Sequence, residues 1–211
     1  MTTFIPIFPL QLVVYPRENL NLHIFEPRYK QLIKECEEEG KTFGIPAYID
    51  GQIKQIGTEL ELVAVEKTYP KGEMDVITKG IGLFKIVKRY RKAPEKLYGA
   101  ADIERLDFTL EGDTLMNEKI LEKIAELFEL LHIDKSLPED ANQLLTYEIA
   151  HHVGFSLEQE YEFLGITSEL ERQSYLFKHL RRIIPVVKEM ERLRERVKMN
   201  GHFKNIVPPS W

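Results

Sequence analysis

Cysteine is almost absent from this sequence, because Cys36 is the only one among 211 residues. A single cysteine excludes an intramolecular disulfide and any zinc site built from several thiolates. It also fits a reducing compartment, for which the cytoplasm is our expectation. Long apolar runs are missing too, since none approaches the roughly 20 residues that a membrane-spanning helix needs. Met1 to Tyr15 lacks the basic start and small-residue cleavage site of a signal peptide, so we expect neither membrane insertion nor export.

The sequence also lacks an excess of positive charge. Its formal net charge is −5, which argues against a surface built throughout to neutralise phosphates but leaves room for a local basic patch. Hydrophobic residues make up 43% and charged residues 30% of the chain, which is ordinary for a globular protein and argues against wholesale disorder. The length fits one large domain or two small ones.

The groups that build active sites are scarce as well. No G-x-x-x-x-G-K-[ST] phosphate loop occurs, and Gly80-Ile81-Gly82 lacks the third glycine and the following helix that hold a pyrophosphate. His151 and His152 are adjacent and point about 100° apart on a helix, whereas zinc-binding helices space their ligands three or four residues apart. The acidic run at Glu35 and 37–39 is interpreted as a solvated helix end. We therefore expect no catalytic residue, no metal site and no cofactor.

Residues 1–107 are predicted to form a β-rich subdomain with one inserted helix. Apolar and polar residues alternate from Asn19 to Phe25, which indicates a strand with one face in a core. Pro27 and Gly40 are placed to begin and to cap a helix between them, whose apolar residues recur every three or four positions. Cys36 is on this apolar stripe and is predicted to be a buried small hydrophobe. The stretch 58–90 is predicted as an antiparallel meander. The expected fold is α+β and begins with a twisted sheet or pseudo-barrel.

Residues 108–201 are predicted to form a C-terminal helical bundle, because the hydrophobic period changes to that of a helix. The first helix has a buried stripe of Met116, Ile120, Ile124, Leu127, Phe128 and Leu131. A second helix is expected over 141–152. Pro185 is expected to kink the last helix, because it removes one backbone hydrogen bond. Residues 202–211 form a tail that is either loosely ordered or pinned by its apolar residues.

Two helix starts in this half carry a capping box, in which a serine and the residue three positions later satisfy each other's backbone donors. The pairs are Ser156 with Gln159 and Ser168 with Glu171. Both predict that a helix begins directly after the serine.

The basic run 85–92 suggests an alternative function. Cations interleaved with an aromatic residue can follow a nucleic-acid backbone and stack a base. The residues of such a patch are Lys85, Lys88, Arg89 and Arg91. The same run also fits a half-buried edge strand guarded by charge. The negative net charge makes RNA binding the alternative rather than the leading hypothesis.

The opening run I-F-P-L-x-L-V-V-Y-P, followed by L-x-L-H-I-F-E-P-R-Y, resembles the start of the N-terminal, substrate-binding domain of Lon proteases. The segments Ile56-Gly57-Thr58 and Asp75 to Ile86 resemble further family motifs, as does the helical half from Ser156 to Leu180. One departure is visible, because Leu83 stands where the family usually has arginine before a phenylalanine. Cereblon carries a similar domain.

The resemblance implies a β-body like that of pseudouridine synthase and archaeosine transglycosylase (PUA-like), joined to a helical bundle. It implies a non-catalytic, stand-alone module, since a chain of this length has no room for the ATPase and serine–lysine peptidase of Lon. The expected partners are unfolded or partly folded protein segments, and a separate protease or ATPase is a further possible partner. Oligomeric state stays open.

The candidate binding residues are aromatics near turns or strand faces: Tyr15, Phe25, Tyr69 and Tyr90. Core packing is the alternative for each, and for Phe25 and Tyr29 of the H-I-F-E-P-R-Y segment it is the interpretation we favour, with Glu26 and Arg28 as a local ion pair. A third hypothesis, an enzyme with a small-molecule cleft between the two halves, is supported by architecture alone.

Overall fold

The computed structural model describes residues 2–202, with side chains as far as Lys198, and separates into two compact units. Unit 1 holds Met1–Glu111 and Leu145–Arg172, and unit 2 holds Gly112–Leu144 and Gln173–Trp211. The sequence placed all of 108–201 in one bundle, whereas the structure places 145–172 with the β-strands. Of the expected tail, all but the first residue lies outside the described residues.

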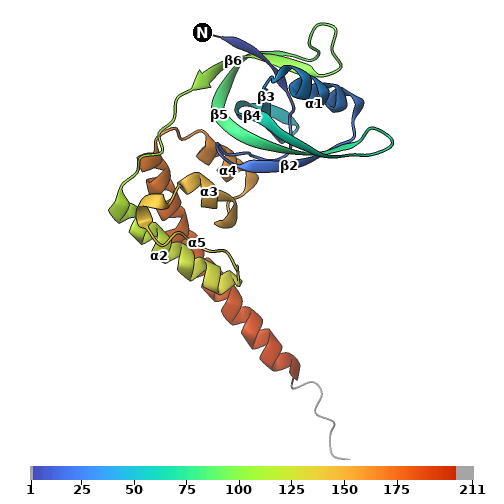
Figure 1. Ribbon diagram of the computed structural model, residues 1–211. Helices are drawn as coiled ribbons and strands as arrows, with labels where there is room; N and C mark the ends of the chain where they lie inside the picture. The colour runs from blue at the N-terminus through green and yellow to red at the C-terminus, as the bar shows by residue number, and fades with distance from the viewer. Residues whose placement is uncertain (1, 203–211) are drawn as a thin grey trace, which may run out of the picture. The chain divides into compact units, whose positions relative to one another are not determined.

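Six strands form one mixed sheet in unit 1 (Figure 1). They are β1 (Thr3–Ile7), β2 (Asn19–Ile24), β3 (Phe43–Ile49), β4 (Gln52–Thr68), β5 (Met74–Tyr90) and β6 (Gly99–Leu106). The strand order is β2-β5-β4-β3-β1-β6, and β6 also pairs with β5, which closes five strands into a barrel. The β1–β3 pair is parallel and the others are antiparallel. The predicted α+β fold with a pseudo-barrel is confirmed.

Strand β5 is long enough to serve two partners along the same edge. Its first part pairs with β2, from Met74 to Lys79, and its second part pairs with β6. Gly80 lies where the partner changes, and a Cβ atom there would meet the Tyr15 carbonyl oxygen at 2.5 Å. Glycine is therefore required for the close approach of two backbone segments. We call β2, the first half of β5 that pairs with it, and the part of β4 that pairs with this half of β5, the arm.

Helix α1 (Pro27–Glu39) has the predicted bounds. Gly40 adopts a left-handed conformation with φ 65°, and its N–H donates to the carbonyl oxygen of Cys36 at 3.0 Å. The inward face of α1 packs into the barrel core through Tyr29, Leu32, Ile33 and Cys36. Burial raises the pKa of the Cys36 thiol to about 12, so this cysteine is a small core hydrophobe, as expected.

Short helical pieces replace the single helix that was predicted over 141–152. They are η1 (Ala141–Gln143), α3 (Thr146–Ile149) and η2 (Ala150–His152). Helix α4 (Leu157–Leu164) follows, and both hydrogen bonds of its Ser156–Gln159 capping box are present.

The capping box predicted at Ser168 and Glu171 is not formed, which is a correction. Helix α5 (Glu169–His202) begins instead with the Glu169 N–H donating to Thr109 Oγ1 at 3.0 Å. The helix nevertheless begins directly after Ser168, as predicted, with a hydroxyl from a distant segment bonded to its first N–H.

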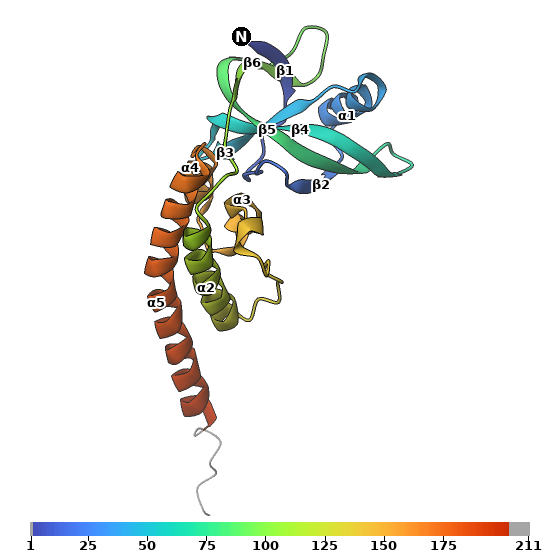
Figure 2. The same ribbon diagram turned by 60° about the vertical axis from the view of Figure 1, so that its left-hand side comes forward.

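Unit 2 contains α2 (Thr114–Leu131) beside the later part of α5 (Figure 2). The α2 residues Ile120, Ile124, Leu127 and Phe128 are buried, and α5 contributes Leu176, Leu180, Ile184 and Val187. Of the predicted α2 stripe, Leu131 is exposed, because it lies at the last residue of the helix. Helix α5 continues through Pro185.

Candidate binding surface

Tyr15 is a core residue and not a surface aromatic, which corrects one of the four candidate positions. Its exposed fraction is 1%, and its ring lies 5.1 Å from that of Tyr147 and 6.0 Å from that of Phe163. Its hydroxyl donates to the Glu160 carbonyl oxygen at 3.3 Å. The segment that holds α3 and α4 therefore folds over Tyr15, and this packing explains why 145–172 belongs to unit 1.

Phe25 is 61% exposed at the end of β2, so the expectation that it packs into the body is wrong. Tyr29 of the same segment is buried, and Arg28 forms the predicted local pair with Glu26 at 2.8 Å. The sequence did not separate Phe25 from Tyr29, since both are aromatic residues beside a strand-to-helix turn.

The structure brings Phe25 and Tyr69 together through His23. The His23 ring lies 6.2 Å from the Phe25 ring and 5.8 Å from the Tyr69 ring. We call these three side chains the arm patch, because they lie where β2 ends and where the β4–β5 turn begins (Figure 1). Sequence reasoning missed His23, although its position two residues before Phe25 on an alternating strand placed both side chains on one face.

Asp75 fixes the orientation of the arm patch. Its carboxylate bonds to His23 Nδ1 at 2.6 Å and accepts from the Tyr69 hydroxyl at 2.7 Å. These hydrogen bonds, the one with His23 foremost, hold the pKa of Asp75 below its usual value. The Lys67 ammonium lies 4.4 Å from the centre of the Tyr69 ring. The arm patch is thus an exposed phenylalanine next to His23 and, beyond it, Tyr69, with Asp75 pairing His23 Nδ1 and the Tyr69 hydroxyl.

Tyr90, the fourth candidate, lies at the opposite end of β5 and does not join the arm patch. It is half-buried, its hydroxyl donates to Asp102 Oδ2 at 2.7 Å, and its ring is 5.7 Å from that of Phe4. The Lys88 ammonium lies 5.0 Å from the centre of the same ring.

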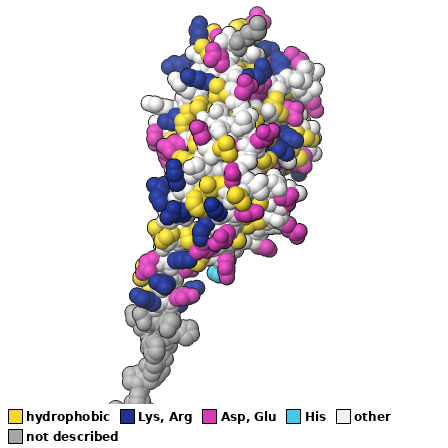
Figure 3. Space-filling view, turned by 90° about the vertical axis from the view of Figure 1, so that its left-hand side faces the viewer, with side chains coloured by type: hydrophobic (Ala, Val, Ile, Leu, Met, Phe, Trp, Pro, Cys, Tyr) yellow, Lys and Arg dark blue, Asp and Glu magenta, His cyan; other side chains and the backbone are white. Residues whose placement is uncertain are grey.

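The basic run is the second half of β5, and Lys85, Lys88 and Arg89 on it are exposed, as is Arg91 directly after it. In the register with β6, Lys85 stands opposite Glu104 and Lys88 opposite Asp102, with a bulge between Ile86 and Lys88. Acidic residues thus oppose two of the four cations. On the face shown in Figure 3, basic and acidic side chains are interspersed rather than gathered by sign.

Glu35 is a buried, fully partnered acid and not part of a solvated helix end, which is a further correction. Its carboxylate accepts from the Tyr98 hydroxyl at 2.5 Å and from the ammonium groups of Lys41 and Lys96, both at 2.9 Å. Burial raises its pKa, but these hydrogen bonds outweigh burial and lower the pKa to about 2. The carboxylate is therefore held as an anion and is not poised to transfer protons.

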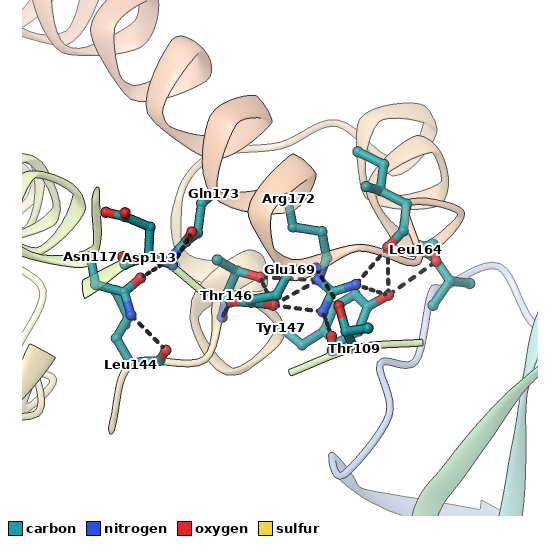
Figure 4. Close-up of polar contacts among 11 residues, drawn as sticks. Thr109, Asp113, Asn117, Leu144, Thr146, Tyr147, Leu164, Glu169, Arg172 and Gln173 are labelled. Atoms are coloured by element: carbon teal, nitrogen blue, oxygen red, sulfur yellow. Dashed lines mark hydrogen bonds and ion pairs between the residues drawn. The ribbon is translucent and has the colours of Figure 1, made fainter. Parts of the chain in front are cut away.

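A second buried charge pair, Arg172 with Glu169, lies at the start of α5 within unit 1 (Figure 4). Their side chains are 0% and 1% exposed, and Arg172 Nη2 lies 2.6 Å from Glu169 Oε2. The remaining guanidinium hydrogen bonds reach Thr146 Oγ1, the Tyr147 hydroxyl and the carbonyl oxygens of Ile166 and Thr109. So complete an enclosure leaves no access for a substrate and indicates a structural role.

His151 joins α4 to the loop before β2. Its Nδ1 lies 2.7 Å from Glu160 Oε1, and its Nε2 lies 3.2 Å from Glu18 Oε2. Burial lowers its pKa, but the two carboxylates outweigh burial and raise the pKa to about 9. Within residues 2–202 no group of three or more His, Cys, Asp or Glu side chains is placed to hold a metal ion. None of the helices in the described chain is long and apolar enough to cross a membrane.

Two solved structures share this architecture. A Lon N-terminal domain protein from Xanthomonas campestris superposes with a TM-score of 0.66 and 22% identity, over 83% of this chain and 98% of that chain. The N-terminal domain of the Mycobacterium avium complex Lon protease gives a TM-score of 0.61 and 12% identity, over 84% and 98%. The class of protein is thus an α+β domain with the Lon N-terminal fold.

The family follows from the sequence itself. The family model for the ATP-dependent protease La (LON) substrate-binding domain matches residues 5–182. The chain therefore belongs to the Lon substrate-binding domain family, and the resemblance seen in its opening run is confirmed.

Proposed function

We propose that this protein is a non-catalytic binding module that captures exposed apolar segments of unfolded or partly folded proteins at the arm patch, in connection with proteolysis. Family membership supports a substrate-binding role. The observation that carries the proposal is Phe25, which exposes 61% of its surface beside the His23 ring, while Asp75 holds the His23 and Tyr69 rings in place.

The physical case rests on the free energy of covering Phe25. Full burial of a phenylalanine side chain is worth about 1.5–3 kcal/mol, so covering its exposed part contributes about 1–2 kcal/mol. The rings of His23 and Tyr69 widen the contact, and Asp75 already pairs His23 Nδ1 and the Tyr69 hydroxyl, so a client does not have to desolvate those two polar groups unpaired. The arm patch is thus suited to apolar segments that a folded protein hides.

The non-enzymatic role and the reducing, cytoplasmic setting belong to the same proposal. A separate ATPase or protease would act on the captured client, since neither the arm patch nor the two buried charge clusters supplies an accessible nucleophile with a base.

Fluorescence anisotropy tests this function with a labelled model protein that is kept unfolded by reduction and alkylation, beside its native form. Wild type should bind the unfolded form and discriminate against the native one. Phe25→Ser should weaken binding about tenfold, as expected for about 1.4 kcal/mol. Phe4→Ser removes a phenylalanine that is 50% exposed outside the arm patch and should change binding less than about twofold. Equal binding of native and unfolded forms, or equal losses in both variants, refutes the proposal.

RNA binding is the second candidate, and it is supported by Arg89 and Arg91, which form no ion pair within the described chain. Counterion release makes such binding strongest at low salt. Titration with single- and double-stranded RNA at low salt tests it, and the absence of binding there eliminates it.

A further inference from the structure

Strands β4 and β5 separate at one end of the barrel and leave two unpaired edges. Their ladder runs from Thr68 opposite Met74 to Ile56 opposite Lys85 and ends there. Both strands continue beyond it: β4 through 52–55, where Gln52 and Ile53 pair with β3, and β5 through 86–90, which pairs with β6. Within residues 2–202 no backbone pairing joins these two stretches to each other. Each therefore presents free N–H and C=O groups toward the other.

The space between these edges is hollow. A pocket of about 380 Å³ is lined by β4 residues 52–55 and by Tyr48, Ile86 and Arg89. A second pocket of about 240 Å³ shares Ile53 and Arg89 with the first and continues past Arg91. We call the two pockets together the barrel groove.

The barrel groove carries charge of one sign. Four cationic side chains line it, from Arg28, Lys54, Arg89 and Arg91, and no aspartate or glutamate is among the lining residues. Arg28 is paired with Glu26, and the charge of Lys54 acts on the Glu158 carboxylate, whereas Arg89 and Arg91 form no ion pair within the part of the chain described. An all-cationic lining in a chain of net charge −5 selects for an anionic occupant.

We propose that the barrel groove binds an extended, acidic polypeptide segment by strand addition to the free edge of β5 at 86–90. The segment's backbone pairs with the unpaired N–H and C=O groups, and its carboxylates face Arg89 and Arg91. The inference rests on the proposed function, because it gives the module a second client contact at the end of β5 opposite the arm patch. It assigns acidic, extended segments to this groove and apolar ones to the arm patch.

Binding of a labelled peptide of about ten residues that alternates Glu with Val tests both parts of the proposal. Replacing Glu with Lys in the peptide tests charge, and methylating its alternate backbone nitrogens tests strand pairing without altering the protein. Wild type should bind the acidic peptide at least tenfold more tightly than either modified peptide, and binding should weaken as salt is raised. Equal binding of the methylated peptide overturns strand addition, and equal binding of the Lys peptide overturns the charge assignment.

Variants then locate the site. The double variant Arg89→Glu with Arg91→Glu should bind the acidic peptide at least tenfold more weakly than wild type. Lys119→Glu with Arg182→Glu, exposed positions of unit 2, makes the same change in net charge and should leave affinity within about twofold. If both double variants lose peptide affinity equally, the assignment of the peptide to the barrel groove is refuted. Circular dichroism melting checks that each variant is folded.

Two further outcomes distinguish a failure of the barrel-groove proposal from a failure of the proposed function. If the wild-type protein binds the unfolded model protein but not the acidic peptide, the proposal for the barrel groove is refuted and the proposed function is not. Wild type that binds the acidic peptide but not the unfolded protein refutes the arm patch alone. A single-stranded RNA that displaces the peptide at lower concentration than unlabelled peptide does, and that loses binding in the Arg89/Arg91 variant, reassigns the groove to nucleic acid.

Discussion

The substitution Glu35→Gln tests whether Glu35 is a buried, hydrogen-bonded carboxylate that stabilises the fold, and not the solvated acid that the sequence predicted. The wild-type carboxylate is held as an anion by Tyr98, Lys41 and Lys96, three groups that lie outside its helix. Glutamine keeps the shape and can still accept hydrogen bonds, but it removes the charge that the two ammonium groups neutralise. The substitution therefore isolates the electrostatic part of the cluster.

The magnitude follows from the pKa. Glu35 has a folded-state pKa of about 2 against an ordinary value of 4.5, and at about 1.36 kcal/mol per pH unit the difference sets an upper limit of about 3 kcal/mol. Lys41 and Lys96 keep 28% and 34% of their side-chain surface exposed, so solvent screening reduces the contribution to about 1–2 kcal/mol. Because the folded-state pKa is lowered, this stability is present above about pH 4.5 and is lost as the pH falls toward 2.

Urea denaturation near pH 7 and near pH 2.5 measures the effect. Glu35→Gln should lower the free energy of unfolding by about 1–2 kcal/mol near neutral pH and by much less in acid. Glu38→Gln, at an exposed position on the same helix, is the matched control and should change stability by less than about 0.5 kcal/mol. A gap between Glu35→Gln and wild type that stays constant across this pH range refutes the reasoning, as does equal behaviour of the two variants.

Two other predictions concern the remaining charge clusters. Arg172→Met should lower the free energy of unfolding by about 3–5 kcal/mol, because Glu169 is left buried without its cation. Urea titration measures this loss, and an Arg172→Met variant as stable as the exposed-site control Arg182→Met would contradict the prediction. His151, whose folded-state pKa is raised to about 9, stabilises the fold below about pH 6.5 and loses this contribution as pH rises through about 9, so His151→Gln should approach wild-type stability in alkali. An NMR titration of the His151 ring with a midpoint near 6.5 rules this out.

Local signals predicted the elements that depend on neighbouring residues. Helix α1 begins at Pro27 and is capped at Gly40 because fixed φ and freedom for positive φ are properties of those residues alone. The capping box at Ser156 and Gln159 formed because both of its hydrogen bonds lie within one turn. The Ser168 box did not form, and the first N–H of α5 donates to the Thr109 hydroxyl, which is distant in sequence.

The candidate aromatic residues show that local sequence signals do not predict which side chains are buried. Tyr15 and Phe25 both lie beside turns in the opening run, yet one is enclosed and the other is 61% exposed. The difference arises because rings from α3 and α4 pack on Tyr15, whereas no element of the described chain buries Phe25. Tyr69 meets Asp75 across the β4–β5 turn, but His23 reaches both of them only once β2 pairs with β5.

The sequence by itself determined the family, the β-rich first half, helix α1 and the core position of Cys36. These follow from periodicity, from the backbone restrictions of proline and glycine, and from motifs contiguous along the chain. Only the tertiary structure decided that 145–172 joins the barrel, that Glu35 and Arg172 are buried ions, and that β4 and β5 part to leave a cationic groove. Those features depend on contacts between residues far apart in the chain, and sequence spacing does not fix which distant groups meet.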